Sequence, residues 1–150
     1  MEYRTDDLTI IDDPIKIIRR NPLLYGGEQP RSARLAAALA RDLICHGDVP
    51  VSVEDVEGWW LITCQKDWLS DGDTDKSQYW SRMIPTPDVM RESIRSEILL
   101  TAFATGLLTM AGGKTQWILR DATMPTVLGS RIRRLAKSNF IGRAVAFTAD

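Results

Sequence analysis

The chain has 150 residues, of which 44% are hydrophobic and 26% are charged, and these shares are typical of a soluble globular protein. This length predicts one domain, residues 1–150, with a hydrophobic core of its own. The formal net charge of −1 at pH 7 argues against bulk nucleic-acid binding.

The chain begins with a polar, acidic stretch, residues 1–14, which we interpret as an N-terminal arm before a folded part over residues 15–150. Pro14 to Arg20 combines isoleucines with basic residues, and this pattern predicts a short amphipathic helix. Asn21-Pro22 is a typical helix breaker, so the helix is expected to end there.

A second helix is predicted from Ser32 to His46, with Ser32 as its N-cap and Gly47 as its end. Its interior is rich in alanine, and small side chains let a helix lie close against a sheet or another helix. His46 is the only histidine of the chain. We interpret it as a structural residue, because a cationic side chain at a helix C-terminus interacts favourably with the helix dipole.

Two strands are predicted next. Val49 to Asp55 shows a period of two, and Trp59 to Cys64 is rich in β-favouring residues. The Glu57-Gly58 turn between them predicts a hairpin. Trp59 and Trp60 allow two interpretations, because tryptophan is enriched both in binding hot spots and in ordinary cores.

Residues 65–85 are predicted to form a polar, acidic loop. The carboxylates that alternate from Asp71 are superficially similar to a calcium-binding loop. However, an EF-hand needs Gly at its sixth position and Glu at its twelfth, where this chain has Lys76 and Arg82. Two cysteines and one histidine without paired spacing do not make a zinc site either. The sequence therefore predicts a solvated loop and no metal site.

Pro87 to Met110 is predicted to be one long helix at the centre of the core. Pro87 suits the first helical position, and Gly112-Gly113 is the expected stop. Charged residues, Arg95 and Glu97 among them, give the first half a polar face, whereas residues 98–111 carry no charge. The second half is therefore expected to be buried on nearly every side. This run of about 14 residues is too short to span a bilayer.

The last part of the chain is predicted to form a strand from Thr115 to Arg120, a helix from Met124 to Ser138 and a strand from Phe140 to Thr148. Residues 114–150 hold 7 basic and 2 acidic residues, whereas residues 1–113 hold 12 basic and 18 acidic ones. Basic residues gather on the outward side of the helix: Arg131, Arg133, Arg134 and Lys137. This basic face is either an ordinary solvated surface or one that steers an acidic partner.

Together these elements predict an α+β fold, a two-layer α/β sandwich with one mainly antiparallel sheet and helices on one face. Cys45 and Cys64 both lie in apolar sequence, so we expect two buried free thiols and a reducing compartment, with one disulfide as the alternative. The N-terminus lacks the apolar stretch of a secretory signal, and we therefore expect a cytoplasmic protein without a membrane segment.

The stretch Ile18-Arg-Arg-Asn-Pro-Leu-Leu-Tyr-Gly-Gly27 resembles the opening motif of the ATPase domain of type II topoisomerases, as in the DNA gyrase B subunit. Ile84-Pro85 and Ala111-Gly-Gly-Lys114 follow in the order in which that family carries I-P and A-G-G-K. The resemblance covers roughly residues 15–114. It implies the GHKL, or Bergerat, α/β sandwich.

The same resemblance implies that the catalytic residues of the family are missing. Ala38 stands where the family has the glutamate that activates water, and Asp42 stands where it has the Mg²⁺-binding asparagine. Alanine cannot act as a base. The family's adenine-reading D-G-x-G motif has a loose echo at Asp71-Gly72 or at Asp67, and no glycine-rich ATP lid precedes Pro125.

We therefore predict a non-enzymatic protein-binding or regulatory protein, such as an adaptor, an inhibitor or an immunity-type protein, on a gyrase B-like scaffold. Its candidate partner-binding residues are Arg131, Arg133, Arg134, Lys137, Trp59 and Trp60. One alternative is a protein that binds ATP or ADP, with Mg-ATP as cofactor, without turnover; its candidate residues are Asp42, Asp67, Asp71 and Gly72. A second alternative is a nucleic-acid-associated protein that uses the basic helix together with Arg143. The sequence leaves the oligomeric state open.

Overall fold

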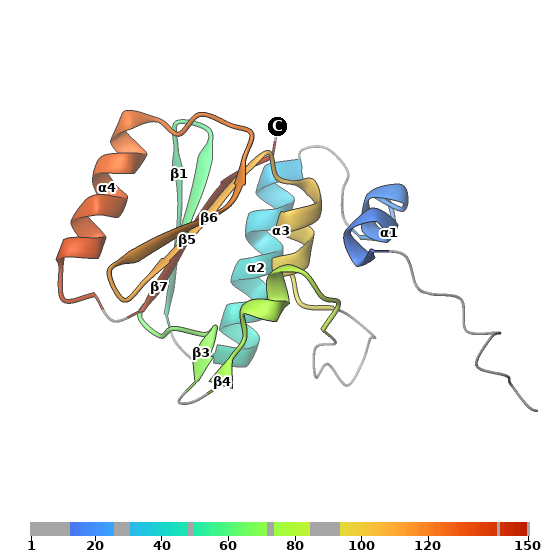
Figure 1. The fold of residues 1–150 in the computed structure, drawn as a ribbon, viewed down its shortest axis with the longest axis horizontal. Coiled ribbons are helices and arrows are strands. Elements are labelled where there is room, and N and C mark those ends of the chain that lie inside the picture. The colour runs from blue at the N-terminus through green and yellow to red at the C-terminus, as the bar shows by residue number, and fades with distance from the viewer. Residues whose placement is uncertain are drawn as a thin grey trace, which may run out of the picture.

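The computed structural model describes residues 13–25, 31–47, 50–71, 74–84, 94–140 and 142–149 (Figure 1). The elements, in chain order, are α1 (Pro14–Arg20), α2 (Arg31–Gly47), β1 (Val51–Val56), β2 (Trp59–Cys64), β3 (Ser70–Asp71), β4 (Thr74–Asp75), the 3₁₀ turn η2 (Ser77–Trp80), α3 (Glu97–Phe103), β5 (Gly106–Ala111), β6 (Lys114–Arg120), α4 (Thr126–Lys137) and β7 (Arg143–Thr148). No helix of the described residues is long and apolar enough to cross a membrane.

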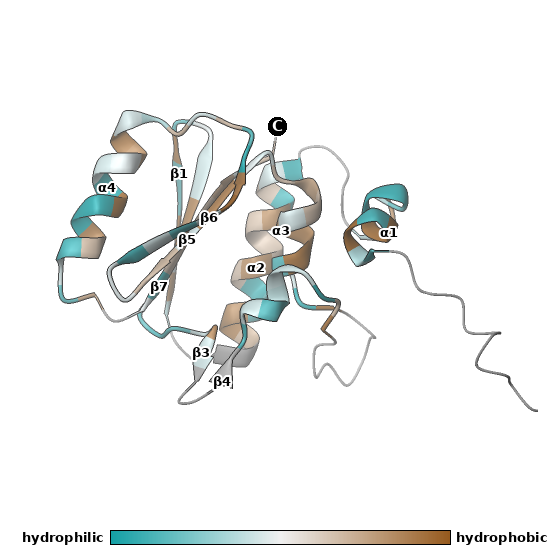
Figure 2. Cartoon of the chain, viewed as in Figure 1, coloured by the Kyte–Doolittle hydropathy of each residue, from teal (hydrophilic) through white to brown (hydrophobic). Residues whose placement is uncertain are grey.

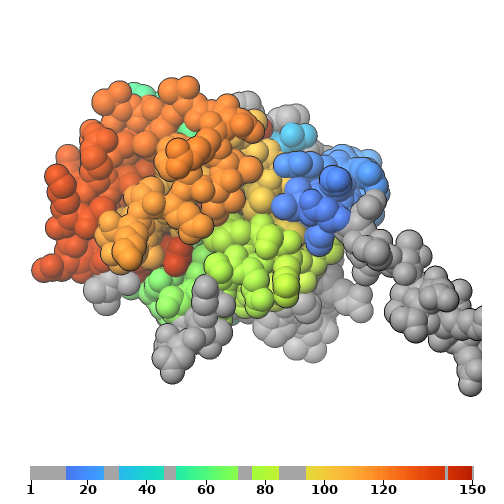
Figure 3. Space-filling view, viewed as in Figure 1, coloured from blue at the N-terminus to red at the C-terminus, as the bar shows by residue number. Residues whose placement is uncertain are grey.

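The main sheet has five strands in the order β1-β2-β7-β5-β6, and every neighbouring pair is antiparallel. The prediction of an α+β fold with a mainly antiparallel sheet is therefore confirmed. The predicted hairpin is present as β1 and β2, and its turn at Glu57 and Gly58 uses positive φ angles at both residues. The two edges of the sheet are β1 and β6, and β6 lies on the side of the molecule that Figure 3 shows.

Helices cover both faces of this sheet, so the expectation of helices on one face is wrong (Figure 1). The α2 and α3 helices share one core with Ile62, Val145 and Phe147, whereas α4 packs on the opposite face through Leu128 and Ile132. The reason lies in the central strands. All residues of β7 from Ala144 to Phe147 are buried, as are those of β5 from Gly106 to Met110. A strand that is apolar on both faces needs a layer on each side.

The predicted long helix from Pro87 to Met110 is also wrong in its second half. The described part of this stretch forms the short helix α3, which ends at Phe103, and then the strand β5. Residues 85–93 lie outside the described part. A continuous apolar run fits a buried strand as well as a buried helix, and periodicity alone cannot separate the two. Gly112 and Gly113, at φ +59° and +75°, form the turn of the β5–β6 hairpin instead of a helix stop.

The prediction of a solvated loop over residues 65–85 is wrong, because the described part of this stretch forms β3, β4 and η2, and its apolar residues Trp68, Leu69 and Trp80 are buried. The other predicted helices and strands agree with the structure to within a few residues. These are the helices α1, α2 and α4 and the strands β6 and β7. Arg19 fastens α1 to α3, because its Nε donates to the carbonyl oxygen of Ala102 at 2.8 Å. Cys45 and Cys64 are free thiols, but only Cys64 is buried. The expected burial of Cys45 is wrong because this residue lies on an exposed side of α2.

Hydrophilic residues lie along α4, while hydrophobic ones gather on α2, α3 and the central strands (Figure 2). Since α4 presents only part of its circumference to the sheet, its other side is free to carry charge. Arg131 and Arg134 of this helix line the groove described below.

Candidate functional site

A groove runs between α4 and the β1–β2 hairpin on the sheet face that α4 covers only in part. It consists of three adjoining cavities of about 450, 330 and 230 Å³. The first and second share Leu135 and Ser138, and the second and third share Ser52 and Thr63. Because neighbouring cavities have lining residues in common, we treat them as one site and call it the α4 groove.

The floor of the α4 groove comes from the hairpin. Ser52 pairs with Thr63 across the two strands, and Glu54 pairs with Leu61, so these four side chains lie on one face of the sheet. The floor therefore offers two hydroxyl groups and the carboxylate of Glu54 beside one apolar side chain. A floor of this kind suits a polar chain with small apolar segments better than a wholly apolar ligand.

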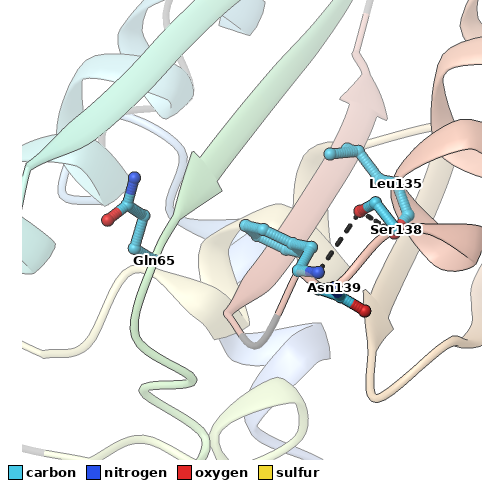
Figure 4. A pocket seen from close by; sticks show the side chains of 5 residues that line it. Gln65, Leu135, Ser138 and Asn139 are labelled. Atoms are coloured by element: carbon cyan, nitrogen blue, oxygen red, sulfur yellow. Dashed lines mark hydrogen bonds between the residues drawn. The ribbon is translucent and has the colours of Figure 1, made fainter.

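The wall of the groove is one stripe of α4. Its lining residues follow helical spacing: Arg131, Arg134, Leu135 and Ser138. At the end of the helix, the Ser138 hydroxyl donates to the carbonyl of Leu135 at 2.7 Å and accepts from the backbone N–H of Phe140 at 3.2 Å. These bonds fix the turn that places Asn139 and Phe140 across from Gln65 (Figure 4). The end of the groove is therefore built from amides and one aromatic ring.

The basic residues that the sequence singled out divide between the groove and open solvent. Arg131 forms an ion pair with Glu54 across the groove. Arg134 lines the groove, is exposed, and makes no ion pair within the described part of the chain. Arg133 is exposed, its Nη2 donates to Ser130 Oγ at 3.3 Å, and it lines none of the three cavities. Lys137 is exposed and lines none of the three cavities.

The two predicted tryptophans lie in the protein interior. Trp59 is 3% exposed and packs edge-to-face on Trp117, with ring centroids 6.2 Å apart. Its ring also lies over Gly106, where an added Cβ would come within 2.5 Å of a ring carbon. Trp60 is half-buried and packs against the core on the α2 side of the sheet. Neither tryptophan lines the α4 groove.

The residues of the predicted nucleotide site are not gathered into one pocket by the described structure. Asp42 is buried and accepts hydrogen bonds from the backbone N–H of Ser96 at 2.9 Å and from Arg41 Nη2 at 3.4 Å. Asp67 forms a two-point ion pair with Arg143, at 2.6 and 3.2 Å. The side chain of Asp71 and the whole of Gly72 lie outside the described residues.

Arg143, the extra basic residue of the nucleic-acid hypothesis, is held inside the fold. Besides its bonds to Asp67, its Nη1 donates to Thr109 Oγ1 at 2.8 Å, and its side chain is only 14% exposed. This pair joins β7 to the start of the loop after β2. Its geometry is that of a structural link, because all three guanidinium nitrogens already have acceptors.

A buried polar cluster lies at the start of α3, where the sequence predicted a polar helix face. Glu97 is 0% exposed and accepts from Arg95 and from Trp68 Nε1, the latter at 3.1 Å. Burial lowers the pKa of Arg95, but its hydrogen bond to Glu97 and the charges of Glu97 and Asp42 raise that pKa by more, so the net shift is upward. The alternation of charge and apolar residues here did not reveal that both charges are internal.

The described residues contain no candidate metal site, since no group of three or more Cys, His, Asp or Glu side chains among them could hold an ion.

Among comparisons with known proteins, no family model, no curated protein and no solved structure matches this chain. The function must therefore be argued from the chemistry of its own surface.

Proposed function

We propose that this chain is a non-enzymatic binding protein that holds an acidic, extended segment of a partner protein in the α4 groove. The observation that carries the proposal is Arg134, an exposed guanidinium without an ion pair in the described structure, on the wall of a groove with a hydroxyl-bearing floor. A guanidinium binds a carboxylate through two parallel hydrogen bonds. Ser52 and Thr63 supply the further donors that a polar chain needs.

Charge supports a protein partner that is acidic. Residues 114–150, which include the groove wall, hold 7 basic and 2 acidic residues. Arg133 and Lys137 lie next to the wall and raise the local positive potential without lining the groove. Such charges speed the encounter with an acidic surface more than they add to affinity.

Two alternatives have less support. A nucleic acid demands several basic side chains that are free to meet phosphates, and here Arg131 is paired with Glu54 while Arg143 is paired with Asp67. A nucleotide site would need the carboxylates of Asp42 and Asp67, which are occupied by partners within the protein. The kinship with gyrase B-type ATPase domains also stays a proposal that rests on the motif at residues 18–27. The binding proposal does not depend on it.

A titration followed by ¹⁵N–¹H NMR tests the proposal. The labelled chain is mixed with a capped peptide of Gly-Ser-Glu repeats, and with a control peptide of Gly-Ser-Lys repeats. We expect the acidic peptide to give saturable shifts at Ser52, Thr63, Leu135 and Ser138, and the basic peptide to give none there.

Two further arms separate the alternatives. A single-stranded oligothymidine that shifts the α4 residues with a steep dependence on salt would replace our proposal by nucleic-acid binding. Shifts around Asp42 on addition of Mg-ATP would replace it by nucleotide binding. If neither peptide produces shifts in the groove, the proposed function is wrong.

A further inference from the structure

The sheet leaves one edge strand, β6, open on the surface. It pairs with β5 on one side only, and Lys114, Thr115 and Gln116 are exposed along it. In Figure 3 the orange segment that contains β6 faces the viewer, and no other segment of the described residues crosses in front of it. An uncovered edge presents unpaired backbone N–H and C=O groups, which can accept a further strand.

The hairpin turn decides which backbone groups of β6 point outward. Gly112 and Gly113 make a two-residue turn, so the pair that closes it, Ala111 with Lys114, exchanges hydrogen bonds within the hairpin. Pairs alternate along an antiparallel ladder, and Gln116 therefore faces β5 as well. The backbone groups of Thr115 and Trp117 are the ones directed to the free edge.

The side chains of β6 oppose pairing of this strand with a copy of itself. The strand carries two positive charges, Lys114 and Arg120, and no acidic residue, so an antiparallel pair of two β6 strands would bring like charges together without any counter-charge. Both residues are exposed, and Arg120 lies over the ring of Trp117 at 5.7 Å. Lys114 takes part in no ion pair within the described part.

The other edge of the sheet does not supply the matching charge. The acidic residues of β1 are engaged within their own molecule, Glu54 with Arg131 and Asp55 with the backbone N–H of Gly58 at 3.0 Å. Joining β1 of one copy to β6 of the next would be a heterologous contact, which produces either a closed ring or an open-ended polymer. The charge pattern therefore fits a foreign strand better than a second copy of this chain.

We propose that β6 receives an extended segment of another protein by strand addition, and that this segment carries two acidic residues opposite Lys114 and Arg120. The ladder has a register shift at Leu107 and Leu108, so Trp117 pairs with Leu108 and Leu119 with Leu107. Because of this irregularity, the β5 residues that pair with Lys114 and Arg120 are only five positions apart, at Ala111 and Gly106. Lys114 and Arg120 therefore lie on opposite faces of the sheet. The complementary segment thus has its two acidic residues five positions apart. This surface is distinct from the α4 groove and does not rest on the proposed function.

The test uses a capped peptide, Glu-Val-Thr-Val-Thr-Glu, and a control in which both glutamates are lysines. In ¹⁵N–¹H spectra of the full chain, the acidic peptide is expected to shift the amides of Thr115 and Trp117 most. In the double variant Lys114→Glu with Arg120→Glu the preference should reverse, so that the lysine peptide binds and the acidic one weakens by about tenfold. Arg133→Glu with Lys137→Glu changes the net charge equally, alters no residue that lines the α4 groove, and should leave binding at β6 in place.

A damaged fold would lose binding to both peptides. Reversal of the preference requires the double variant to gain binding to the lysine peptide, so it cannot come from a damaged fold. If the double variant does not fold, Lys114→Glu alone is used, and it should weaken the acidic peptide by about threefold. Strand addition is refuted if both peptides shift β6 equally, or if neither does. It is also refuted if the chain without peptide self-associates through β6 with rising concentration, because a second copy would then be the occupant.

Discussion

At the scale of single residues, the charges of this protein serve two different purposes. Arg95 and Glu97 are internal, and together with Trp68 they join α3 to the loop after β2. Arg131 and Glu54 form a pair whose side chains are 39% and 42% exposed. Water and salt screen such a pair, whereas a buried charge without its partner is left uncompensated.

This contrast gives a matched pair of substitutions. Glu97→Gln keeps the shape and the acceptor for Trp68 but removes the counter-charge that is hydrogen-bonded to the buried Arg95, and it should lower the free energy of unfolding by about 3–5 kcal/mol. Glu54→Gln removes the partner of the exposed Arg131 and should cost about 0–1 kcal/mol. Urea denaturation of both variants measures the difference. Equal losses would show that the two ion pairs do not differ as we describe.

A second residue-scale prediction concerns hydrolysis. Ala38 lines a shallow cavity of α2 together with Tyr25 and Arg41, and alanine offers no group that could activate water. We expect no release of phosphate from Mg-ATP above the rate in buffer. The prediction would be contradicted by a rate of phosphate release that rises in proportion to protein concentration and is lost in Asp42→Asn, a variant that keeps the side-chain shape.

At the scale of elements, periodic sequence patterns predicted the correct type of element, whereas a continuous apolar run did not. The period of two in β1, the turn at Glu57 and the one-sided charge of α4 each have one simple interpretation, and these elements were predicted correctly. The run Gly106–Ala111 has no period, so its strand could be assigned only by its partners β7 and β6. The α4 groove was predictable only as a basic helix face, because its floor comes from the distant hairpin.

The β5–β6 hairpin can be tested through its turn. Gly112 has φ +59° and an added Cβ there meets nothing within 4 Å. Asparagine tolerates this backbone conformation, so Gly112→Asn should change the free energy of unfolding by less than about 0.5 kcal/mol. Valine is β-branched and disfavours positive φ, so Gly112→Val should cost about 1–3 kcal/mol. Thermal unfolding of the two variants measures both effects. Equal effects of the two substitutions would count against a left-handed backbone conformation at Gly112.

At the scale of the whole molecule, the two connections β2–α3–β5 and β6–α4–β7 determine the layers. Each connection joins two parallel strands that have one other strand between them in the sheet. The two connections run in opposite directions along the sheet. They also cross opposite faces, because α3 lies on one face and α4 on the other. It follows that the two crossovers have opposite hands, and one departs from the general right-handed preference. With two right-handed crossovers α4 would lie beside α2 and α3, as the sequence analysis expected. The double-sided apolar character of β5 and β7 is what requires a helix on each face.

The whole-molecule arrangement also creates the α4 groove, since a single helix on that face leaves the β1–β2 side uncovered. Our central claim is that this groove, and specifically its Arg134 wall, binds an acidic partner segment. Two neighbouring arginines allow a sharp comparison, because Arg134 lines the groove and Arg133 does not. Arg134→Glu and Arg133→Glu change the net charge of the molecule by the same amount.

The most direct measurement is therefore the binding of the immobilised Gly-Ser-Glu peptide to the wild type and to these two variants, at low and at high salt. We predict that Arg134→Glu weakens equilibrium binding by about tenfold or more, mainly through faster dissociation. Arg133→Glu should slow association by about threefold or less, and only at low salt. Equal losses in the two variants, or binding by the wild type that ignores both substitutions and added salt, would contradict the claim that the acidic segment lies in the α4 groove.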